Sequence, residues 1–194
     1  QDKTVLFLCY NRTLANKIKY RFNKYDDRIN VTTFHSLAKQ IITDTDKDWW
    51  KNNFKKDDEF WSLTIPVKLD SIIHLYDKKY DTIIIDEGQD FPPELYKMLA
   101  LYWGKLKKED INFVPTVLAD ENQKLNEDGS TLKEIRKELS ALTVANFREK
   151  LLDQNYRNTK EIAKFAAKFY AGAPTGVPSD KNCRDGQKPV LFWH

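Results

Sequence analysis

The sequence predicts an α/β fold in which a parallel sheet is flanked by helices. Short runs rich in apolar and β-branched residues end at residues 9, 34, 85 and 119. The run that ends at residue 85 has no polar alternation, which is typical of a strand buried on both faces of a parallel sheet. Polar residues follow each run, and a helical pattern of apolar residues every three or four positions comes next. This repeated order of strand, polar turn and helix is the order that builds such a sheet.

The first two strand and helix units have the same layout. Residues 4–9 form the first predicted strand, and Asn11 belongs to the polar turn that closes it. Residues 29–34 form the second strand, and His35 and Ser36 follow at its end. The apolar faces of the two helices that come next consist of Leu14, Ile18 and Phe22, and of Leu37, Ile41 and Ile42.

Residues 44–79 differ in character and are predicted to form a small inserted subdomain. Clustered Trp and Phe side chains are typical of the core of a small helical insertion. They also suit stacking on nucleic-acid bases, and the sequence leaves both interpretations open. The aromatic residues of this segment, set among lysines and aspartates, are Trp49, Trp50, Phe54, Phe60 and Trp61.

The apolar run that ends at residue 85 leads directly into two adjacent carboxylates, Asp86 and Glu87, and then into Gln89 and Asp90. In open α/β sheets, ligands bind at the carboxyl ends of the strands. Two acids at that edge can serve a metal ion and a reacting water. The alternative is an acidic loop that only keeps a strand end solvated, but such a loop has no need of Gln89 and Asp90.

The second half of the chain continues the pattern. Residues 113–119 form a fourth predicted strand, and it ends in polar residues from Asp120 to Gln123. A later helix is predicted to open at Asn158, which has capping-box spacing with Glu161, and to run to about residue 171. Beyond it, residues 173–188 are rich in Pro, Gly and charge and are predicted to form a linker or surface loop, while residues 189–193 look like the start of a strand.

Composition limits the classes of protein. No apolar run approaches the roughly 20 residues that a membrane span needs, so we expect no membrane partner. Cys9 and Cys183 lack CxxC spacing, which predicts neither a disulfide framework nor a zinc site and favours a reducing, cytoplasmic setting. The net charge of +3 gives little indication of a nucleic-acid partner. Because the chain begins at Gln1 within a charged segment, we expect a piece of a longer protein.

The order of the motifs resembles the superfamily 1 DNA and RNA helicases of the UvrD/Rep type, which are built on RecA-like ATPase folds. Residues 86–91, DEGQDF, look like helicase motif II, the Walker B element in its DExQD form. Residues 33–36, TFHS, are similar to the segment that touches the nucleic-acid strand. Residues 119–123, ADENQ, look like motif III, with Ala119 in place of the usual glycine. Two further segments are similar to motifs Ia and IV, residues 10–15 and 155–157.

This resemblance implies ATP and Mg²⁺ as cofactors and gives roles to the polar residues at the strand ends. Asp86 would hold Mg²⁺, and Glu87 would act as the general base on the water that attacks the γ-phosphate. Gln89 and Gln123 would sense the γ-phosphate, since an amide both donates and accepts hydrogen bonds. For Gln123 the alternative is an ordinary loop amide.

The resemblance also implies roles outside the acidic motif. Tyr156 would stack on the adenine and Arg157 would act as an arginine finger, the alternatives being core packing and a surface charge. His35 is equally well interpreted as a packing residue. The implied partner is single-stranded nucleic acid, with DNA favoured. The residues that would contact the strand are Asn11, Thr33, Phe34, His35 and Ser36.

The phosphate-binding motif G-x-x-x-x-G-K-[ST] does not occur in these 194 residues. We therefore expect a truncated first RecA-like motor domain, with an inactive isolated chain and an active parent helicase. The alternative is a non-catalytic nucleic-acid-binding module derived from a helicase. A metal-dependent nuclease is a weaker rival, because Asp120 is the only clear further ligand. The predicted parts are the motor domain at 1–43 and 80–172, a 1B-like insertion at 44–79, and a linker with the start of the second motor domain at 173–194.

Overall fold

The chain forms two compact units, residues 1–147 and residues 148–194. Among the residues that the structure describes, no helix is both long and apolar enough to cross a membrane. Cys9 and Cys183 are both buried free thiols. The computed structural model describes residues 3–22, 28–107, 114–124, 127–140, 148–152, 155–170 and 180–190.

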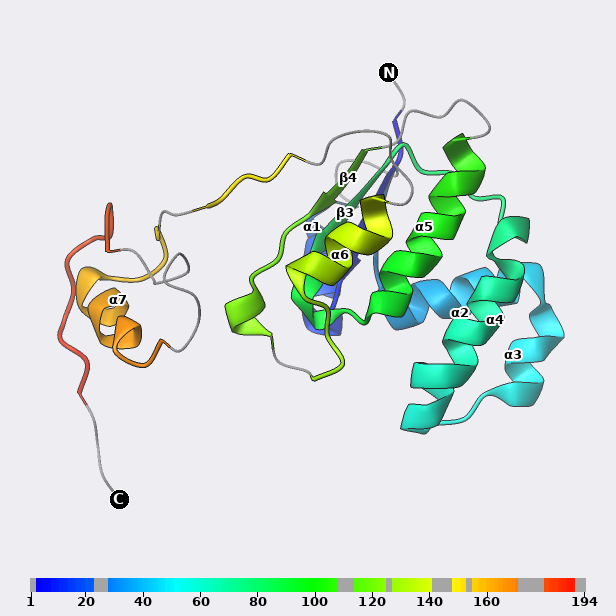
Figure 1. Ribbon diagram of the computed structural model, residues 1–194, viewed down its shortest axis with the longest axis horizontal. Helices are drawn as coiled ribbons and strands as arrows, with labels where there is room; N and C mark the ends of the chain where they lie inside the picture. The colour runs from blue at the N-terminus through cyan, green and yellow to red at the C-terminus, as the bar shows by residue number, and fades with distance from the viewer. Residues whose placement is uncertain are drawn as a thin grey trace. The chain divides into compact units, whose positions relative to one another are not determined.

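The first unit is built on a parallel sheet, as the sequence predicts (Figure 1). The strand order is β2-β1-β3-β4, and each neighbouring pair is parallel. In the register, Cys9 lies beside both Thr33 and Asp86, so three strands end level with one another. The strands are β1 (Val5–Cys9), β2 (Ile29–Thr33), β3 (Thr82–Asp86) and β4 (Val114–Val117). Phe113, included in the predicted fourth strand, lies outside the described residues.

Helices cover the two faces of the sheet unequally. Successive side chains of a strand point to opposite faces, so Leu6 and Leu8 enter one layer while Phe7 and Cys9 enter the other. On the second face α1 (Arg12–Phe22) packs its apolar stripe over β1 and β2. Figure 1 shows α5 and α6 on the opposite side of the sheet from α1. The elements whose residues form the larger core on the first face include α2 (Phe34–Thr45), α4 (Ile65–Ile72), α5 (Pro93–Lys107) and α6 (Leu132–Ser140).

The segment predicted as an insertion is helical, and its aromatic residues pack together. Phe60 is 1% exposed and lies in the same core cluster as Ile83 of β3. Trp49, Trp50 and Trp61 are partly buried against that core. The cluster is therefore shown as a packing core, while base stacking by its outer rings stays a prediction. The elements here besides α4 are α3 (Lys47–Asn53), the π-helix η1 (Phe60–Thr64) and the 3-10 helix η2 (Ile73–Leu75).

In the second unit, α7 (Lys160–Ala167) begins one residue later and ends earlier than predicted. Thr159, not Asn158, caps the helix: its hydroxyl oxygen accepts the backbone N–H of Ile162 at 3.4 Å. The predicted capping box is wrong, because the Glu161 carboxylate accepts the N–H of Gly186 at 2.8 Å. Thr fits the cap because its hydroxyl reaches the first turn as well as an Asn amide does.

The predictions for the last part of the chain are only partly covered by the structure. The helix α7 ends at Ala167, short of the predicted end near residue 171. Pro189 and Val190 are not in a strand. Residues 173–179 of the predicted linker and residues 191–194 lie outside the described part of the chain. Two short 3-10 turns remain in the first unit, η3 (Gly88–Asp90) and η4 (Glu121–Gln123).

Phe34 is the first residue of α2 and is 6% exposed within the main core. Truncating a buried Phe to Ala typically costs about 3–5 kcal/mol, because the lost contacts leave a cavity. We expect Phe34→Ala to lower the free energy of unfolding by about that amount in urea denaturation. Phe54→Ala is the matched control, since that ring is 49% exposed and its loss should cost much less. Equal effects for the two variants would contradict the core placement of Phe34.

Candidate functional site

The carboxyl ends of the parallel strands form one edge, and the sequence places polar residues at this edge after every strand. Asp86 is the last residue of β3 and lies level with Cys9 of β1 and Thr33 of β2. The next strand, β4, leads through Leu118 and Ala119 to Asp120. The prediction that polar clusters meet at one edge is therefore confirmed for the four strands of the first unit.

The turn after β3 is held tightly against β4. Gly88 donates its N–H to the carbonyl of Leu118 at 2.8 Å, and its own carbonyl accepts the Tyr96 hydroxyl at 2.6 Å. A Cβ on Gly88 would lie 2.5 Å from Cγ1 of Val117, so only glycine fits this approach. Glu87 has φ 54° and ψ 50°, the left-handed region that is uncommon for residues other than glycine. Strain of this kind gathers at functional sites.

A buried amide connects the turn after β3 with the loop after β4. Gln89 has 0% of its surface exposed. Its Nε2 donates to Oε2 of Glu87 at 2.8 Å, and its Oε1 accepts the backbone N–H of Asp120 at 3.0 Å. On the far side, Nε2 of Gln123 donates to Oδ2 of Asp120 at 2.6 Å. We call this continuous chain of hydrogen bonds, from Glu87 through Gln89 and Asp120 to Gln123, the Gln89 bridge.

The two adjacent acids have different surroundings. Asp86 is half-buried and Glu87 is exposed. Burial, and then the charge of Glu87, raise the pKa of Asp86, although its Oδ1 accepts the N–H of Glu87 at 3.2 Å. Burial and the charge of Asp86 also raise the pKa of the Cys9 thiol to about 11, so Cys9 is a neutral thiol and not a nucleophile.

Two of the residues predicted to touch nucleic acid, Asn11 and Thr33, cap the helices that start at this edge, and Ser36 lies in the first turn of α2. Oδ1 of Asn11 accepts the N–H of Thr13 at 2.7 Å, in the first turn of α1. Oγ1 of Thr33 accepts the N–H of Ser36 at 3.4 Å and donates to the Ser36 hydroxyl oxygen at 3.1 Å, in the first turn of α2. A polar residue directly before an amphipathic helix is a sequence signal for an N-cap, and it indicates the capping roles of Asn11 and Thr33.

The other two predicted contacts differ in exposure. Phe34 is buried in the core, so its ring has no free face for a base in this structure. His35 is exposed, and its ring lies edge-on to Trp61 with 4.2 Å between the ring centroids. Partial desolvation of the ring lowers the pKa of His35, which favours the neutral form. His35 therefore packs on the inserted segment and still reaches solvent.

Tyr156 and Arg157 belong to the second unit. Both side chains are exposed, Tyr156 with 73% of its surface, so the core interpretation of Tyr156 is wrong within that unit. Oδ1 of Asn155 accepts the N–H groups of Arg157 and Asn158, at 3.2 and 3.1 Å, which fixes a turn beneath them. Their predicted approach to a nucleotide at Glu87 stays a prediction.

The donors at the edge fit a metal that binds mainly through phosphates and water. The described residues hold no group of three or more His, Cys, Asp or Glu side chains that could bind a metal. Both carboxylate oxygens of Asp120 accept amide hydrogen bonds, from Asn122 and Gln123. Mg²⁺ needs only one or two protein carboxylates when phosphates supply further oxygens. Asp86 meets this need, whereas a nuclease site needs further ligands at this edge.

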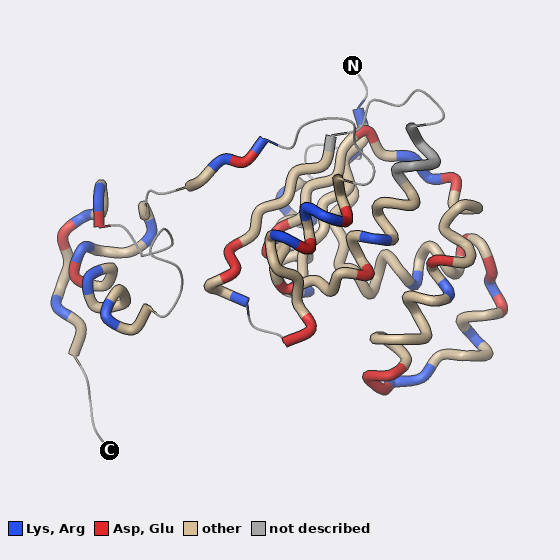
Figure 2. Tube along the Cα trace, in the orientation of Figure 1, with Lys and Arg blue, Asp and Glu red and all other residues tan. Residues whose placement is uncertain are grey.

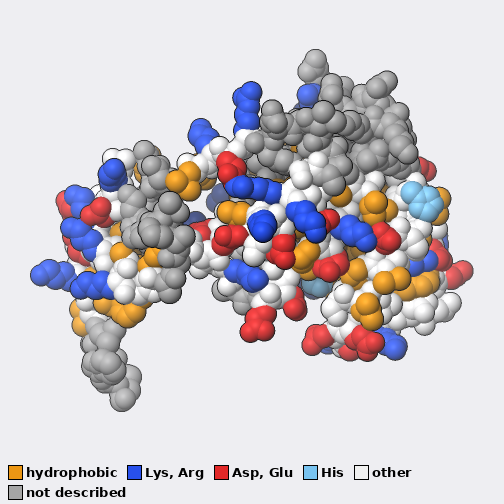
Figure 3. Space-filling model, in the orientation of Figure 1, with side chains coloured by type: hydrophobic (Ala, Val, Ile, Leu, Met, Phe, Trp, Pro, Cys, Tyr) orange, Lys and Arg blue, Asp and Glu red, His pale blue; other side chains and the backbone are white. Residues whose placement is uncertain are grey.

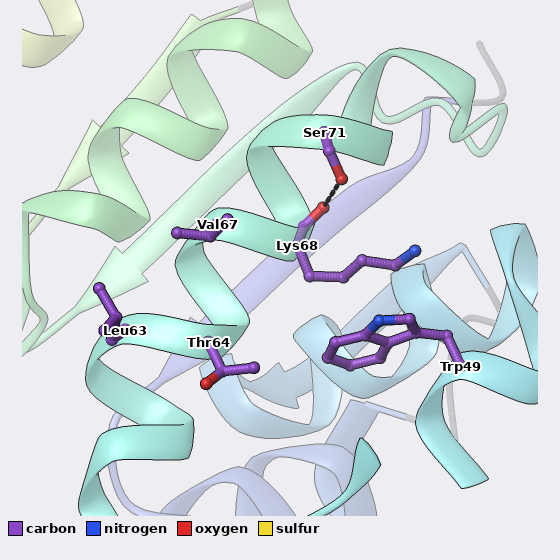
Figure 4. Close-up of a pocket in the computed structure, with 6 residues that line it drawn as sticks. All are labelled: Trp49, Leu63, Thr64, Val67, Lys68 and Ser71. Atoms are coloured by element: carbon purple, nitrogen blue, oxygen red, sulfur yellow. Dashed lines mark hydrogen bonds between the residues drawn. The ribbon is translucent and has the colours of Figure 1, made fainter. Parts of the chain in front are cut away.

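Two hollows on the first unit, both beside α4, are lined by none of the predicted site residues. One, of about 380 Å³, lies beside α4 (Figure 4). There the ammonium of Lys68 lies over the Trp49 ring, 5.2 Å from its centroid, and pairs with Asp46 at 2.7 Å. The residues that line the hollow are Trp49, Leu63, Thr64, Val67, Lys68 and Ser71.

No family model matches the chain, and no curated protein matches it. The geometry of the edge is therefore the basis for a candidate function. This geometry combines an exposed Glu87 carboxylate in a strained turn, a half-buried Asp86 beside it, and the Gln89 bridge to the loop after β4. Such an arrangement can hold a metal-bound anion and accept a proton from water, and a change at one loop can reach the other.

Replacing Gln89 with Leu should separate the two loops. Leu fills a similar volume but leaves the half-buried N–H of Asp120 without this partner, whereas water can solvate the exposed Glu87 carboxylate. Unpaired buried polar groups cost about 1–3 kcal/mol each, so we expect the free energy of unfolding to fall by about that amount. Gln123→Leu is the control, because Gln123 is exposed and water can replace its hydrogen bond. Equal stability of Gln89→Leu and wild type would contradict the bridge.

The raised pKa of Asp86 predicts that the ionised Asp86 carboxylate lowers the free energy of unfolding, and that this effect depends on pH. Because the folded state holds the Asp86 proton more tightly than the unfolded chain does, its contribution to stability falls as pH rises above about 3.9. Asp86→Asn should therefore raise the free energy of unfolding at pH 7, and this gain should vanish near pH 3.

Asp81 provides a control of opposite sign. Hydrogen bonds from the backbone N–H and hydroxyl of Thr4 lower the pKa of Asp81, so its stabilisation is present at pH 7 and is lost as pH falls through its folded pKa. Asp81→Asn should lower stability at pH 7. Urea denaturation at pH 7 and pH 3 measures the free energy of unfolding of the two variants. A loss of stability in Asp86→Asn at pH 7 would contradict the destabilising effect of the ionised Asp86.

Proposed function

We propose that this chain is part of an ATP-dependent helicase or translocase, which couples ATP hydrolysis to movement on single-stranded nucleic acid. DNA unwinding is the favoured case. The observation that carries the proposal is the Gln89 bridge, because it links the exposed Glu87 carboxylate to a second loop at the ligand-binding edge of a parallel sheet. The motif order and this parallel sheet support a RecA-like motor domain.

In this proposal the two acids divide the work at the nucleotide. Glu87 is the general base: its carboxylate is exposed, and Gln89 holds one of its oxygens at 2.8 Å and so fixes its direction. Asp86 would hold Mg²⁺, which when bound neutralises charge on the phosphates of ATP. The raised pKa of Asp86 supports this role, because a divalent cation relieves the repulsion between two adjacent carboxylates.

Residues outside the pair Asp86 and Glu87 would connect the nucleotide with the nucleic-acid strand. Gln123 ends the Gln89 bridge and is exposed, so it is available to a ligand at the edge. The two helix starts capped by Asn11 and Thr33 present backbone N–H groups to the same edge, a setting that suits the phosphates of a strand. Exposed Tyr156 and Arg157 fit stacking on adenine and reaching the γ-phosphate in the assembled motor.

The proposal requires partners within a longer protein. The phosphate cradle G-x-x-x-x-G-K-[ST] is not in these 194 residues, so another segment of the parent must supply it, together with a second RecA-like domain. A cytoplasmic setting fits the two free thiols. The missing cradle is also the observation that favours the second candidate, a non-catalytic nucleic-acid-binding module derived from a helicase.

The test measures phosphate release by the parent protein with single-stranded DNA. Glu87→Gln keeps the shape of the side chain and an oxygen for Gln89, so nucleotide binding should persist while hydrolysis falls by roughly 10² to 10⁴. Asp86→Asn should instead weaken Mg²⁺ binding, so that a higher Mg²⁺ concentration is needed for hydrolysis. Glu94→Gln, an exposed acid at the start of α5, is the control and should leave the rate unchanged.

Three results decide between the candidates. Full activity of Glu87→Gln would show that Glu87 is not the base. Rapid hydrolysis by the isolated 194-residue chain would contradict the need for a separate phosphate cradle. A parent that binds DNA but releases no phosphate would favour the non-catalytic module.

A further inference from the structure

The helix α1 carries cations on an outer face that the functional site does not use. Its 11 residues include no acid, and none of its cations forms an ion pair within the described part of the chain. Unpaired cations on one short helix create a local positive potential although the net charge of the protein is only +3. The four cations are Arg12, Lys17, Lys19 and Arg21.

The helix presents these charges away from the sheet. Ala15 is buried, and Leu14 and Ile18 are partly buried against the second face of the sheet. Residues four apart lie on the same face of a helix, so the solvent side carries two adjacent rows. All six residues of these rows are exposed: Arg12, Asn16 and Tyr20 in one, and Thr13, Lys17 and Arg21 in the other.

An aromatic ring stands among the cations. Tyr20 is 82% exposed, and Lys17 lies three residues before it on the same face. A large exposed ring surrounded by cations is poorly suited to an apolar protein partner, because desolvating the cations would be costly. It is well suited to a strand that offers both phosphates and flat bases.

The helix α6, on the other side of the sheet, also carries cations but differs from α1 in its acidic residues. In α6, acids alternate with cations, and Figure 2 shows both colours along its trace. On the face shown in Figure 3, cationic and acidic side chains lie side by side. Lys137 has an acidic neighbour within 3.9 Å, Glu138. The absence of acids therefore sets α1 apart from this helix.

We propose that the outer face of α1 binds single-stranded nucleic acid, with phosphates on Arg12, Lys17 and Arg21 and a base stacked on Tyr20. This inference rests on the proposed function and extends the strand path, because α1 begins at the edge where Asn11 caps it. The helix is about 16 Å long, enough for several phosphates of an extended strand. Recognition is by charge and stacking and is therefore independent of base sequence.

The test is fluorescence anisotropy of the 194-residue chain with a labelled oligothymidylate of about 16 nucleotides at a series of salt concentrations. The double variant Lys17→Glu with Arg21→Glu should reduce the slope of log affinity against log salt by about 1.4, since each phosphate contact contributes about 0.7. The control reverses two exposed cations with the same spacing on α6, Lys133→Glu with Lys137→Glu, and changes net charge equally.

Substitutions at Tyr20 test stacking separately from charge. Tyr20→Ala should weaken binding by about fivefold to a hundredfold, whereas Tyr20→Phe keeps the ring and should bind like wild type. Tyr20 is exposed, so neither variant removes a core contact, and circular dichroism verifies the fold. Equal losses in the α1 and α6 double variants would overturn the inference, because they would show a response to net charge alone.

Two further results separate this inference from the proposed function. Failure of the wild-type chain to bind the oligonucleotide, with binding to vesicles of anionic phospholipid through the same α1 cations, would overturn the inference in favour of a membrane surface. Failure of the proposed function appears elsewhere, as full ATP hydrolysis by Glu87→Gln in the parent. The α1 variants should leave the nucleotide affinity of the parent unchanged without DNA, because they lie outside the acid pair and the Gln89 bridge.

Discussion

The Gln89 bridge is the interaction on which the rest of the site depends. A fully buried amide holds the carboxylate of Glu87 with its donor and the backbone of Asp120 with its acceptor. Because the two ends of an amide differ, only one arrangement satisfies both partners in a dry environment. The bridge can form only where β3 and β4 are neighbours and end together, so the sheet order is a condition for the site.

The site keeps features that cost stability. Glu87 occupies the left-handed region of the backbone, and Asp86 is half-buried beside a second acid. The surrounding structure holds them in place: Gly88 lies against Val117, and the Tyr96 hydroxyl binds the carbonyl of Gly88. Strain and repulsion that persist inside such a tightly packed turn are typical of sites that bind a ligand, since the ligand relieves them.

Polar residues at the edge have structural duties that explain part of their pattern. Asn11 and Thr33 satisfy N–H groups in the first turns of α1 and α2, as the geometry of helix starts demands. Because α1 and α2 each follow a parallel strand, their positive ends lie at the same edge of the sheet, a setting that favours anions. The cations of α1 continue this positive character along the side of the sheet.

The sequence by itself determined the parallel α/β class, the strands and the meeting of Asp86, Glu87 and Gln89 at one edge, because apolar runs and helical periods are local patterns. It did not determine that Gln89 reaches Asp120, because that contact joins residues far apart in the chain. Phe34 was predicted as the last residue of the second strand and as a nucleic-acid contact, yet it begins α2 and lies in the core. The cap at Thr159 instead of Asn158 was likewise decided by the fold, since Glu161 is engaged by Gly186. Tertiary packing decides burial and long-range hydrogen bonds, because both depend on residues that are distant in the sequence and that a local sequence pattern does not identify.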